Sequence, residues 1–440
     1  MVGERTALLR REDVVVVALL AVCIGVGAAL RLGAVDDRLP PNRHAPGDVE
    51  RYYVGTAESY LAGTGWVSRY RQNFIPPPLQ AGFIVLVRKL VPDASYGALR
   101  TVQAWIGTAT IVLAFWIGAQ LGGRWAGVAA AVLFALDPAV VGLVGVLLAE
   151  TNYLFLLFAF LGTLIAATRR CSATLAGASG LLLGLTSLTK PFPVLLVALV
   201  PAWWIGRRRD RRSVAMAVAL AAAFSLPVLP WVARNYDRYG RILPISTNGG
   251  TALAMGNYLA LDSSRTVYWE EIQHRGAWKS PEIEARFSGR RDRYGKLDWN
   301  GRDAAYARHA LAYIRDHPGH FLRNYAIKLY NVFRYPLAAT GKPLRARHYF
   351  RMAVLLTGLA GAAWFAATRW AQPEFILIPI LGYFAAMTAL FHISRSGRIN
   401  LPVKLLVGFF ASWMLTRAAG VAQRAIRNRR QPDPDGRARR

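Results

Sequence analysis

Long apolar runs recur along this chain of 440 residues, and charged or aromatic stretches separate them. A helix of about 17 to 25 apolar residues crosses the hydrocarbon core of a bilayer, and a shorter run suffices when charged side chains at its ends reach the interface. The pattern predicts an all-α polytopic membrane protein with about ten transmembrane helices. These are expected at Val14–Leu30, Thr101–Leu121, Trp125–Val146, Thr151–Ala167, Ala173–Thr189, Phe192–Gly206, Ser213–Val232, Met352–Ala367, Phe375–Phe391 and Leu401–Leu415.

The first apolar run begins shortly after Arg10 and Arg11. A cleaved signal peptide is the competing interpretation, but the run is long and lacks a clear small-residue cleavage site, which favours a signal anchor. Arg31 follows the run, and its long side chain is expected to extend to the membrane interface. Residues 1–13 then form a cytoplasmic tail.

The charge distribution orients the predicted helices. The formal net charge is +29, and the excess Lys and Arg residues lie in short runs beside apolar segments, as the positive-inside rule expects of cytoplasmic loops. This placement predicts a multi-pass protein of the bacterial inner membrane with both termini cytoplasmic, and it argues against nucleic acid as a partner. The runs are Arg124, Arg169–Arg170, Arg207–Arg212, Arg369 and Arg417–Arg440.

Two long polar segments then fall on the outer face, at residues 34–100 and 233–351. Within them, residues 75–91 and 321–333 carry apolar residues in stretches too short or too interrupted to span, which predicts interfacial helices. The transmembrane domain is expected to occupy residues 14–418, and a disordered basic cytoplasmic tail residues 419–440.

The first outer segment places two carboxylates, Asp48 and Glu50, close to the predicted membrane surface. Apolar residues from Tyr53 to Leu61 recur at helical spacing, and Gly63 then ends the predicted helix. Asp48 has two interpretations. It caps the N-terminus of this helix, or it acts as a general base beneath a cover of aromatic residues.

Polar side chains at the outer ends of other predicted helices complete the candidate site. Glu150 lies between two apolar runs, where an ionised group is costly, so it is either a water-exposed loop residue or a supporting catalytic carboxylate. Arg side chains bind phosphate oxygens with a planar fork, but each of them could equally anchor a helix at the interface. The candidates for substrate binding are Tyr53, Lys190, Arg234, Asn235, Asn248, Arg395 and Arg398.

Two of the motifs have a structural interpretation first. Asp137 precedes Pro138, which predicts a break in the helix. The sequence Asn248-Gly249-Gly250 predicts a turn, and a backbone that approaches a ligand is the less favoured alternative.

Patterns typical of metal sites are weak in this sequence. His317 and His320 could share one helical face, but Pro318 interrupts that helix and no Cys joins them. Asp36-Asp37 is a further weak candidate. We assign no metal site, and a divalent metal is the one cofactor left open.

An ordered series of motifs resembles the GT-C superfamily of membrane glycosyltransferases. Asp48-x-x-x-Tyr52 after the first span, followed by Ala, Leu and Gly-x-Gly, is similar to the first outer loop of two groups. These are the polyprenyl-phosphate-sugar-dependent protein mannosyltransferases and the aminoarabinose transferase-like lipid glycosyltransferases. Further pieces follow in the shared order, which carries the resemblance because each piece alone is weak. They are Asp137-Pro138, Glu150, Lys190-Pro191, Pro230–Tyr236, Ser246–Gly250, Gly256-Asn257, His317-Pro318, Arg395, Arg398 and Pro402.

The resemblance implies a fold of many helices and an inverting transfer of a hexose or pentose from a polyprenyl-phosphate-linked donor. The acceptor would be a hydroxyl group of a lipid, glycan or protein at the outer membrane face, among membrane lipids. Asp48 is then the first candidate for the base, with Glu50 and Glu150 as supporting carboxylates. Val49 stands where family members often carry a second acid, and Glu50 is the candidate replacement. Arg234, Arg395 and Arg398 are candidates for binding the lipid phosphate.

A transporter or flippase of lipid-linked sugars is the alternative, because it would need the same basic and aromatic residues. Transporters commonly contain paired repeats with broken helices in both halves. This chain shows no internal repeat and places its predicted extramembrane segments on one face. A scaffold protein would explain neither the carboxylates nor the Arg residues, so we expect an enzyme.

Overall fold

The computed structural model describes residues 11–35, 49–66, 76–243, 245–258, 279–291, 298–333, 346–391 and 400–430. Every regular element in these ranges is a helix, which confirms the predicted all-α class. The helices are α1 (Arg11–Leu32), α2 (Val49–Leu61), α3 (Pro78–Leu90), α4 (Tyr96–Gly122), α5 (Arg124–Leu136), α6 (Pro138–Leu143), α7 (Glu150–Arg170), α8 (Ala173–Thr189), α9 (Leu196–Arg208), α10 (Arg211–Tyr239), α11 (Gly249–Gly256), α13 (Pro281–Phe287), α14 (Trp299–Asp316), α15 (Pro318–Phe333), α16 (Ala346–Arg369), η1 (Pro373–Ile376), α17 (Leu377–Phe391) and α18 (Leu401–Arg430).

Seven of these elements are long and apolar enough to cross a membrane, so the chain is a polytopic membrane protein. They are α1, α4, α7, α10, α16, η1 with α17, and α18. The number of ten is not confirmed, because three predicted spans form shorter helices. Helices α5 and α9 have 13 residues each and α8 has 17. At a rise of 1.5 Å per residue, α5 is about 20 Å long, less than the hydrocarbon core of about 30 Å.

The helix break predicted at Asp137 is present. Helix α5 ends at Leu136, and the Asp137 carboxylate accepts a hydrogen bond from the backbone N–H of Ala139 at 2.8 Å, which caps α6. The chain then turns through residues 144–149 and starts α7 at Glu150. The break therefore shortens the predicted span Trp125–Val146. Asp137 begins the segment that connects α5 to α7, and Glu150 directly follows this segment.

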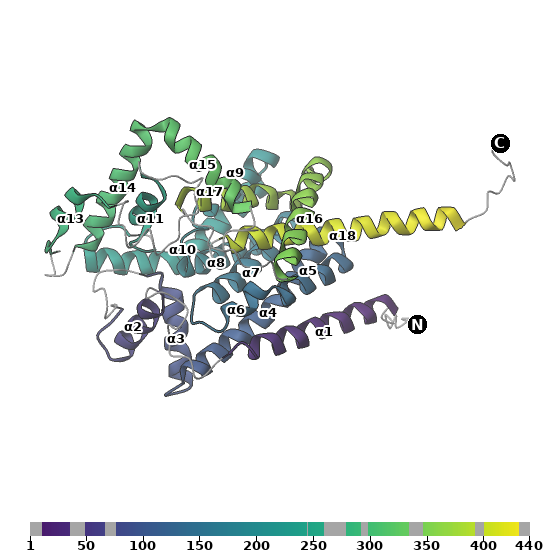
Figure 1. Ribbon diagram of the computed structural model, residues 1–440, viewed down its shortest axis with the longest axis horizontal. Coiled ribbons are helices and arrows are strands. Elements are labelled where there is room, and N and C mark those ends of the chain that lie inside the picture. Colours follow the sequence, from purple (N-terminus) through teal and green to yellow (C-terminus); the bar gives the residue numbers. More distant parts are fainter. Residues whose placement is uncertain are drawn as a thin grey trace.

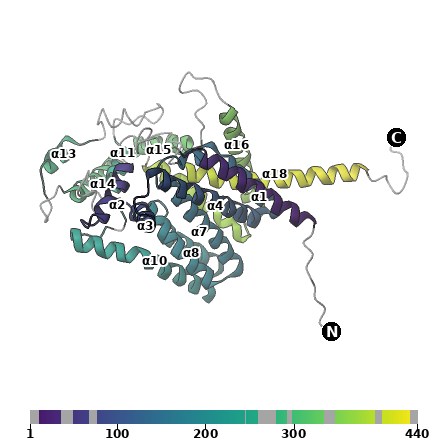
Figure 2. The same cartoon turned by 90° about the horizontal axis from the view of Figure 1, so that it is seen from below.

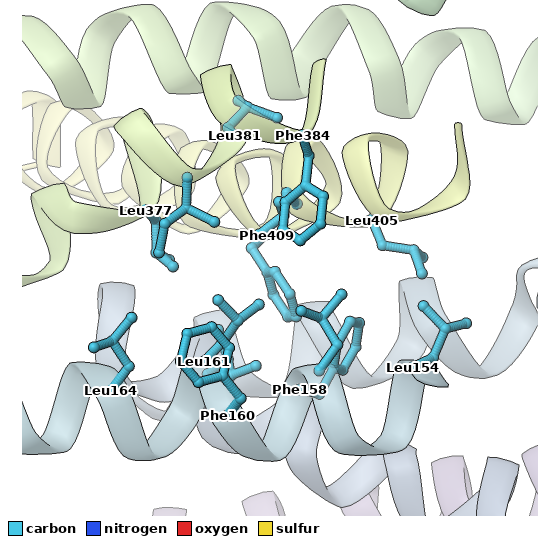
Figure 3. Close-up of a cluster of buried hydrophobic side chains, with 14 of the residues drawn as sticks. Leu154, Phe158, Phe160, Leu161, Leu164, Leu377, Leu381, Phe384, Leu405 and Phe409 are labelled. Carbon is cyan, nitrogen blue, oxygen red and sulfur yellow. The ribbon is translucent and has the colours of Figure 1, made fainter. Parts of the chain in front are cut away.

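Helix α7 is the centre of the hydrophobic core (Figure 3). The Phe158 ring packs between Phe134 of α5 and Phe409 of α18, at centroid distances of 5.2 and 5.1 Å. Leu377 and Phe384 of α17 close the cluster from the other side. A helix enclosed in this way is expected to be apolar around most of its circumference, as the sequence of α7 is.

Helices α8 and α10 approach each other closely at two glycines. A β-carbon on Gly180 would lie 2.1 Å from the carbonyl oxygen of Leu220, and one on Gly184 would lie 2.7 Å from that of Phe224. Small residues four positions apart let helix backbones meet in a membrane, where apolar surface alone drives no association. This contact fixes the course of α8, which ends at Lys190.

The two ends of the helix bundle differ in chemistry. The start of α1 and the end of α18 lie at one end, and α2, α3, α13 and α14 lie at the other (Figures 1 and 2). Arg124, Arg169 and Arg207 are at the end with the start of α1, where Arg124 pairs with Glu12 and Asp13. We call it the basic end and the opposite one the loop end. The basic connections thus share one end, as the charge pattern predicts.

Helices form at both positions where interfacial helices are predicted. Helix α3 covers most of residues 75–91 and buries Ile84 against α2, while Leu86 and Leu90 remain exposed. Helix α15 follows the predicted break at Pro318. Helix α2 stops before Gly63, whose φ of 76° lies in the left-handed region that favours glycine.

Two features differ from the expectations. Helix α18 continues through residues 419–430, which we expected to be disordered, because this Ala- and Arg-rich stretch favours helix and no proline follows before Pro432. Arg31 does not extend to the interface but is completely buried. Its guanidinium donates hydrogen bonds to the carbonyls of Phe134 and Ala135, which the end of α5 leaves without partners inside the helix.

Candidate active site

An ion pair joins the buried Glu150 to the partly buried Lys190 at the loop end. Glu150 begins α7 and is 4% exposed. Lys190 directly follows α8, and its Nζ atom lies 2.8 Å from Oε1 of Glu150. Helices α7 and α8 are antiparallel neighbours, so the start of one meets the end of the other. The positive end of the α7 dipole further stabilises the carboxylate.

The ion pair lines a small cavity of about 20 Å³, close to the space of one water molecule. The Tyr153 ring lies 5.7 Å from the Lys190 ammonium and forms part of the wall. The other lining residues are Leu154, Phe192, Phe384, Thr388, Leu401 and Pro402. A paired carboxylate and ammonium with mostly apolar neighbours interact more strongly than they would in water. The ion pair therefore places two opposite charges on the wall of a largely apolar cavity.

A chain of buried amides supports the turn before Glu150. Asn152 donates to Gln80 at 2.8 Å, Gln80 donates to Gln103 at 2.9 Å, and Gln103 donates to the carbonyl oxygen of Val146 at 3.0 Å. These residues come from α7, α3, α4 and the turn. Buried amides that hydrogen-bond to one another restrict the geometry of the elements that carry them. The chain thus fixes the position from which Glu150 starts.

Tyr53 lies in the buried cluster between α2 and α3, together with Ile84, Leu99 and Leu147. It is not among the residues that line the Glu150–Lys190 cavity. Leu147 belongs to the turn before Glu150, so the cluster packs α2 and α3 against the same turn that the amide chain holds.

Arg234 and Asn235 occupy the end of α10 and bind other parts of the chain. Arg234 donates to the carbonyl oxygen of Trp66 and to Oδ1 of Asn235, both at 2.9 Å. Asn235 is fully buried and donates to the carbonyl oxygen of Leu243. The contact with Trp66 joins the segment after α2 to the end of α10.

Asn248 is exposed and immediately precedes α11. The first N–H groups of α11 bind Asp303 instead, since Gly250 and Thr251 donate to its carboxylate at 3.0 and 2.7 Å. A β-carbon on Gly250 would lie 1.9 Å from the carbonyl oxygen of Asp303. The glycine therefore allows close contact between α11 and α14.

Comparisons with known proteins bear on this arrangement. Similar structures include the archaeal oligosaccharyltransferase AglB from Archaeoglobus fulgidus in complex with an inhibitory peptide and a dolichol-phosphate, with a TM-score of 0.55 and 15% identity over 98% of this chain and 53% of that one. The apo form of the Archaeoglobus fulgidus oligosaccharyltransferase gives 0.56 and 15% over 94% and 52%. This chain thus spans about half the length of these proteins, and at such identity the likeness concerns the fold.

A sequence model of glycosyltransferase family 87 matches residues 74–275, the part of the chain that contains Glu150 and Lys190. The resemblance to the GT-C membrane glycosyltransferases is confirmed. ArnT from Cupriavidus metallidurans bound to undecaprenyl phosphate shows a weaker likeness, with a TM-score of 0.39 and 16% identity over 96% of this chain and 81% of that one. No curated protein matches the chain in sequence.

Several predicted residues of the GT-C site lie outside the described part of the chain. These are Asp48, Arg395 and Arg398. Glu50 falls in the first turn of α2, but its side chain is not described. The roles predicted for these four residues stay predictions. The segment that contains Arg395 and Arg398 is followed closely by Leu401 and Pro402, which line the cavity.

The histidines considered for a metal have other partners. His317 stacks on Tyr313 at a centroid distance of 5.4 Å, and His320 hydrogen-bonds with Tyr313 and Asn324. Within the described ranges, no three His, Cys, Asp or Glu side chains gather where they could hold a metal ion. Asp36-Asp37 lies outside these ranges.

The sequence indicated both Glu150 and Lys190 as candidate residues, but it did not predict that they form an ion pair. It also gave no prediction of the amide chain. Gln80 lies in a segment interpreted as interfacial, and Asn152 follows Glu150 by two residues. Polar side chains within an apolar run usually point into the protein, and this signal was available for Asn152 and Gln103.

Proposed function

We propose that the protein is a glycosyltransferase that moves a sugar from a polyprenyl-phosphate-linked donor to a hydroxyl group of a lipid, glycan or protein. The observation that carries the proposal is the ion pair between the buried Glu150 and Lys190, beside a cavity at the loop end. It lies inside the segment that matches glycosyltransferase family 87. The GT-C fold and the seven membrane helices support a donor that is itself a membrane lipid.

The transfer is an inverting displacement. The acceptor oxygen forms a bond to the anomeric carbon from one side while the bond between that carbon and the phosphate oxygen breaks on the other side. The electron pair of the broken bond stays on the phosphate, and the proton of the hydroxyl group passes to a carboxylate. Asp48 is the proposed base. Glu150 holds the Lys190 ammonium in place and accepts hydrogen bonds from substrate hydroxyls.

The reaction is proposed to occur at the outer face of a bacterial inner membrane, with both termini in the cytoplasm. The basic end carries the start of α1, the end of α18 and the arginine-rich connections, and the candidate site lies at the opposite end. Single cysteines at Thr64 and Arg212, introduced with Cys23 and Cys171 replaced, would test this orientation. An impermeant thiol reagent added to intact cells should label position 64 and not 212, and labelling of 212 alone would reverse it.

The direct test is transfer of label by the purified full chain. It is incubated with radiolabelled polyprenyl-phosphate sugars and membrane extracts, and label is expected to move to an acceptor. Failure with every donor would contradict the proposal, and movement of the intact lipid-linked sugar across vesicles without transfer would identify a flippase.

The base is tested with Asp48→Asn, which keeps much of the capping ability of the side chain. Transfer is expected to fall by about a hundredfold or more, since the base is lost. If Asp48 only caps the helix, the substitution should lower the free energy of unfolding by at most about 1 kcal/mol and leave transfer intact. Glu50→Gln is the control. Normal transfer in Asp48→Asn with loss in Glu50→Gln would reassign the base, and normal transfer in both would reject this mechanism.

A further inference from the structure

A cavity of about 510 Å³ lies between α13 and the start of α14, at the loop end (Figure 1). We call it the α13–α14 cavity. Its volume falls in the range of about 300 to 1,000 Å³ that is usual for small-molecule sites. The lining combines two aromatic rings with three charged side chains, which are Phe287, Trp299, Glu284, Asp298 and Arg302.

Arg302 holds the aromatic and acidic parts of this lining together. Its Nε atom donates to Oε1 of Glu284 at 3.1 Å, and its guanidinium lies 4.7 Å from the ring centroid of Trp299. The Tyr306 hydroxyl donates to the same oxygen of Glu284. Every hydrogen bond to Glu284 within the described ranges uses Oε1, and the side chain is 37% exposed. Oε2 of Glu284 is therefore available to a ligand.

The start of α14 is also held in place by contacts within the chain. Oδ1 of Asp298 accepts a hydrogen bond from the backbone N–H of Gly301 at 2.8 Å, and Oδ2 lies 3.7 Å from Nε of Arg290. The Phe287 ring packs against Gly301, where a β-carbon would lie 2.8 Å from a ring atom. Side chains that are already fixed lose little freedom on binding, which favours affinity.

The chemistry of the lining suits a neutral saccharide. Carboxylate oxygens and guanidinium N–H groups hydrogen-bond to hydroxyl groups, and the negative face of an aromatic ring attracts the polarised C–H groups of a sugar ring. Each carboxylate is paired with an arginine, so an ionic ligand would have to compete with a partner already in place. An apolar ligand would bury these charged groups without hydrogen bonds, which is costly.

We propose that the α13–α14 cavity binds a neutral saccharide unit of the acceptor. The inference rests on the proposed function, since it selects a glycan from the acceptor classes that this function allows. Helix α11 packs against both α14 and α17, and α17 contributes Phe384 and Thr388 to the Glu150–Lys190 cavity. Packed helices at the loop end thus connect the two cavities. The saccharide in the α13–α14 cavity is not the unit that reacts but holds the acceptor while another of its hydroxyl groups reaches the candidate site.

Binding of the purified full chain in detergent to an array of neutral, anionic and cationic oligosaccharides tests the site without any sugar transfer. Neutral oligosaccharides are expected to bind, and the affinity for the best of them is compared among variants. Trp299→Leu removes the ring and should weaken binding about tenfold or more, whereas Trp299→Phe keeps a ring and should stay within about threefold of the wild type.

Two further variants separate loss of the site from loss of the fold. Ser288→Arg places a long side chain at the cavity from an exposed position and should weaken binding without removing a side chain of the core. Trp370→Leu is the matched control, because it removes an exposed tryptophan that lies beside Arg207 at the basic end, and it should bind as the wild type does. Thermal unfolding shows which variants fold.

Three results would overturn the site. They are binding to no oligosaccharide, binding to anionic oligosaccharides alone, and wild-type affinity in both Trp299→Leu and Ser288→Arg.

The transfer assay then tests the link to the acceptor. Trp299→Leu should raise the KM for the acceptor by a larger factor than it changes kcat or the KM for the donor. A wild type that transfers sugar, with an acceptor KM that Trp299→Leu leaves unchanged, would reject the acceptor site alone. A wild type that binds oligosaccharides through this cavity but transfers no sugar would reject the proposed function alone.

Discussion

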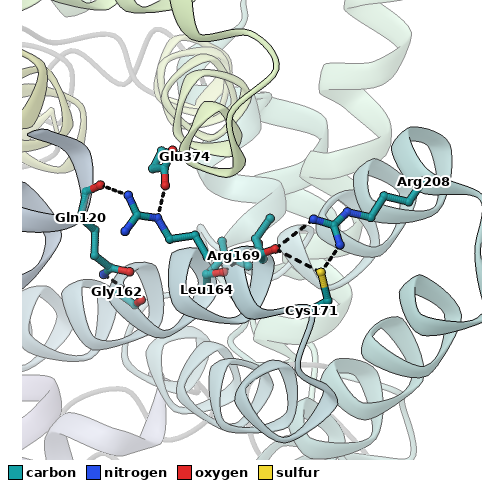
Figure 4. Close-up of polar contacts among 8 residues, drawn as sticks. Gln120, Gly162, Leu164, Arg169, Cys171, Arg208 and Glu374 are labelled. Carbon is teal, nitrogen blue, oxygen red and sulfur yellow. Dashed lines mark hydrogen bonds and ion pairs between the residues drawn. The ribbon is translucent and has the colours of Figure 1, made fainter.

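The two ends of α7 each carry a buried carboxylate paired with a basic side chain, and the described surroundings of the two pairs differ. At the loop end Glu150 pairs with Lys190, and at the basic end Arg169 pairs with Glu374, which is 6% exposed (Figure 4). The two carboxylates are similarly buried, but the Arg169 side chain is 43% exposed and the Lys190 side chain 20%.

Their neighbours differ. Arg169 also donates to the carbonyl oxygen of Gln120, and the Gln120 amide donates to that of Gly162. Arg208 binds Cys171 and the carbonyl oxygen of Thr168 nearby (Figure 4). These contacts tie the ends of helices to one another. The Glu150–Lys190 pair instead lines a cavity. A buried ion pair is therefore weak evidence of function by itself, and the space beside it decides.

The largest expected effect separates the two carboxylates directly. Glu150→Gln should reduce sugar transfer by about a hundredfold, whereas Glu374→Gln should keep it within about threefold of the wild type. Glu150→Gln leaves a partly buried cation without its carboxylate and should lower the free energy of unfolding by about 1 to 3 kcal/mol. Glu374→Gln leaves the more exposed Arg169, so its cost should be smaller, about 1 kcal/mol or less. Transfer rates and thermal unfolding in detergent measure the two effects. Equal losses of transfer would mean that the pairs do not differ in function.

The next effect concerns the helix that carries Lys190 to the cavity. Gly180→Ala places a β-carbon against the Leu220 carbonyl and should lower the free energy of unfolding by about 1 to 3 kcal/mol. Gly177→Ala on the same helix meets its nearest atom at 3.8 Å and should be neutral or slightly stabilising. Thermal unfolding compares the two variants. Similar stabilities would show that the backbones can separate without cost.

The smallest effect concerns Lys328. Unlike Lys190, which pairs with a carboxylate, Lys328 has neutral hydrogen-bond partners. Lys328 donates to the carbonyl oxygen of Gly256 at 2.8 Å and to Oδ1 of Asn257 at 3.2 Å. Burial lowers the pKa of Lys328 to about 7 from its usual 10.5. The folded chain then binds fewer protons than the unfolded chain between these values, so stability should rise with pH in this window, by at most about 1.4 kcal/mol per unit.

Thermal unfolding between pH 6 and 9 measures this slope. Lys328→Met should reduce it, whereas Lys89→Met, at an exposed lysine, should not. A slope that persists in Lys328→Met would assign the titration to another group.

The sequence predicted the parts of the fold that depend on local pattern. The apolar runs predicted the positions of the long spans. Asp137-Pro138 predicted the break after α5, because proline lacks the backbone N–H donor of a helix wherever it lies in the membrane. The short lengths of α5 and α9 were not predicted, because hydropathy does not distinguish an apolar residue in a turn from one in a helix. Charge placement predicted that the basic connections share one end.

Contacts between distant residues could not be predicted in this way. Glu150 and Lys190 were both candidates, but their pairing depends on how α7 and α8 meet. Arg31 was expected to reach the interface, and the end of α5 instead supplies carbonyl groups that bind it. The cavity lined by Asp137, Arg351 and Lys404 lies between three helices that are far apart in the sequence, so no single stretch of residues encodes it.

Leu401 lines both the Glu150–Lys190 cavity and a second cavity between α5, α16 and α18. If the donor is a membrane lipid, as in the proposed function, it can enter sideways between helices and never has to leave the plane of the bilayer. Its supply is then governed by how many donor molecules share each unit of membrane area, rather than by any concentration in water. Diluting the membrane with inert lipid should therefore slow the reaction at constant total donor, as expected of an enzyme that searches in two dimensions.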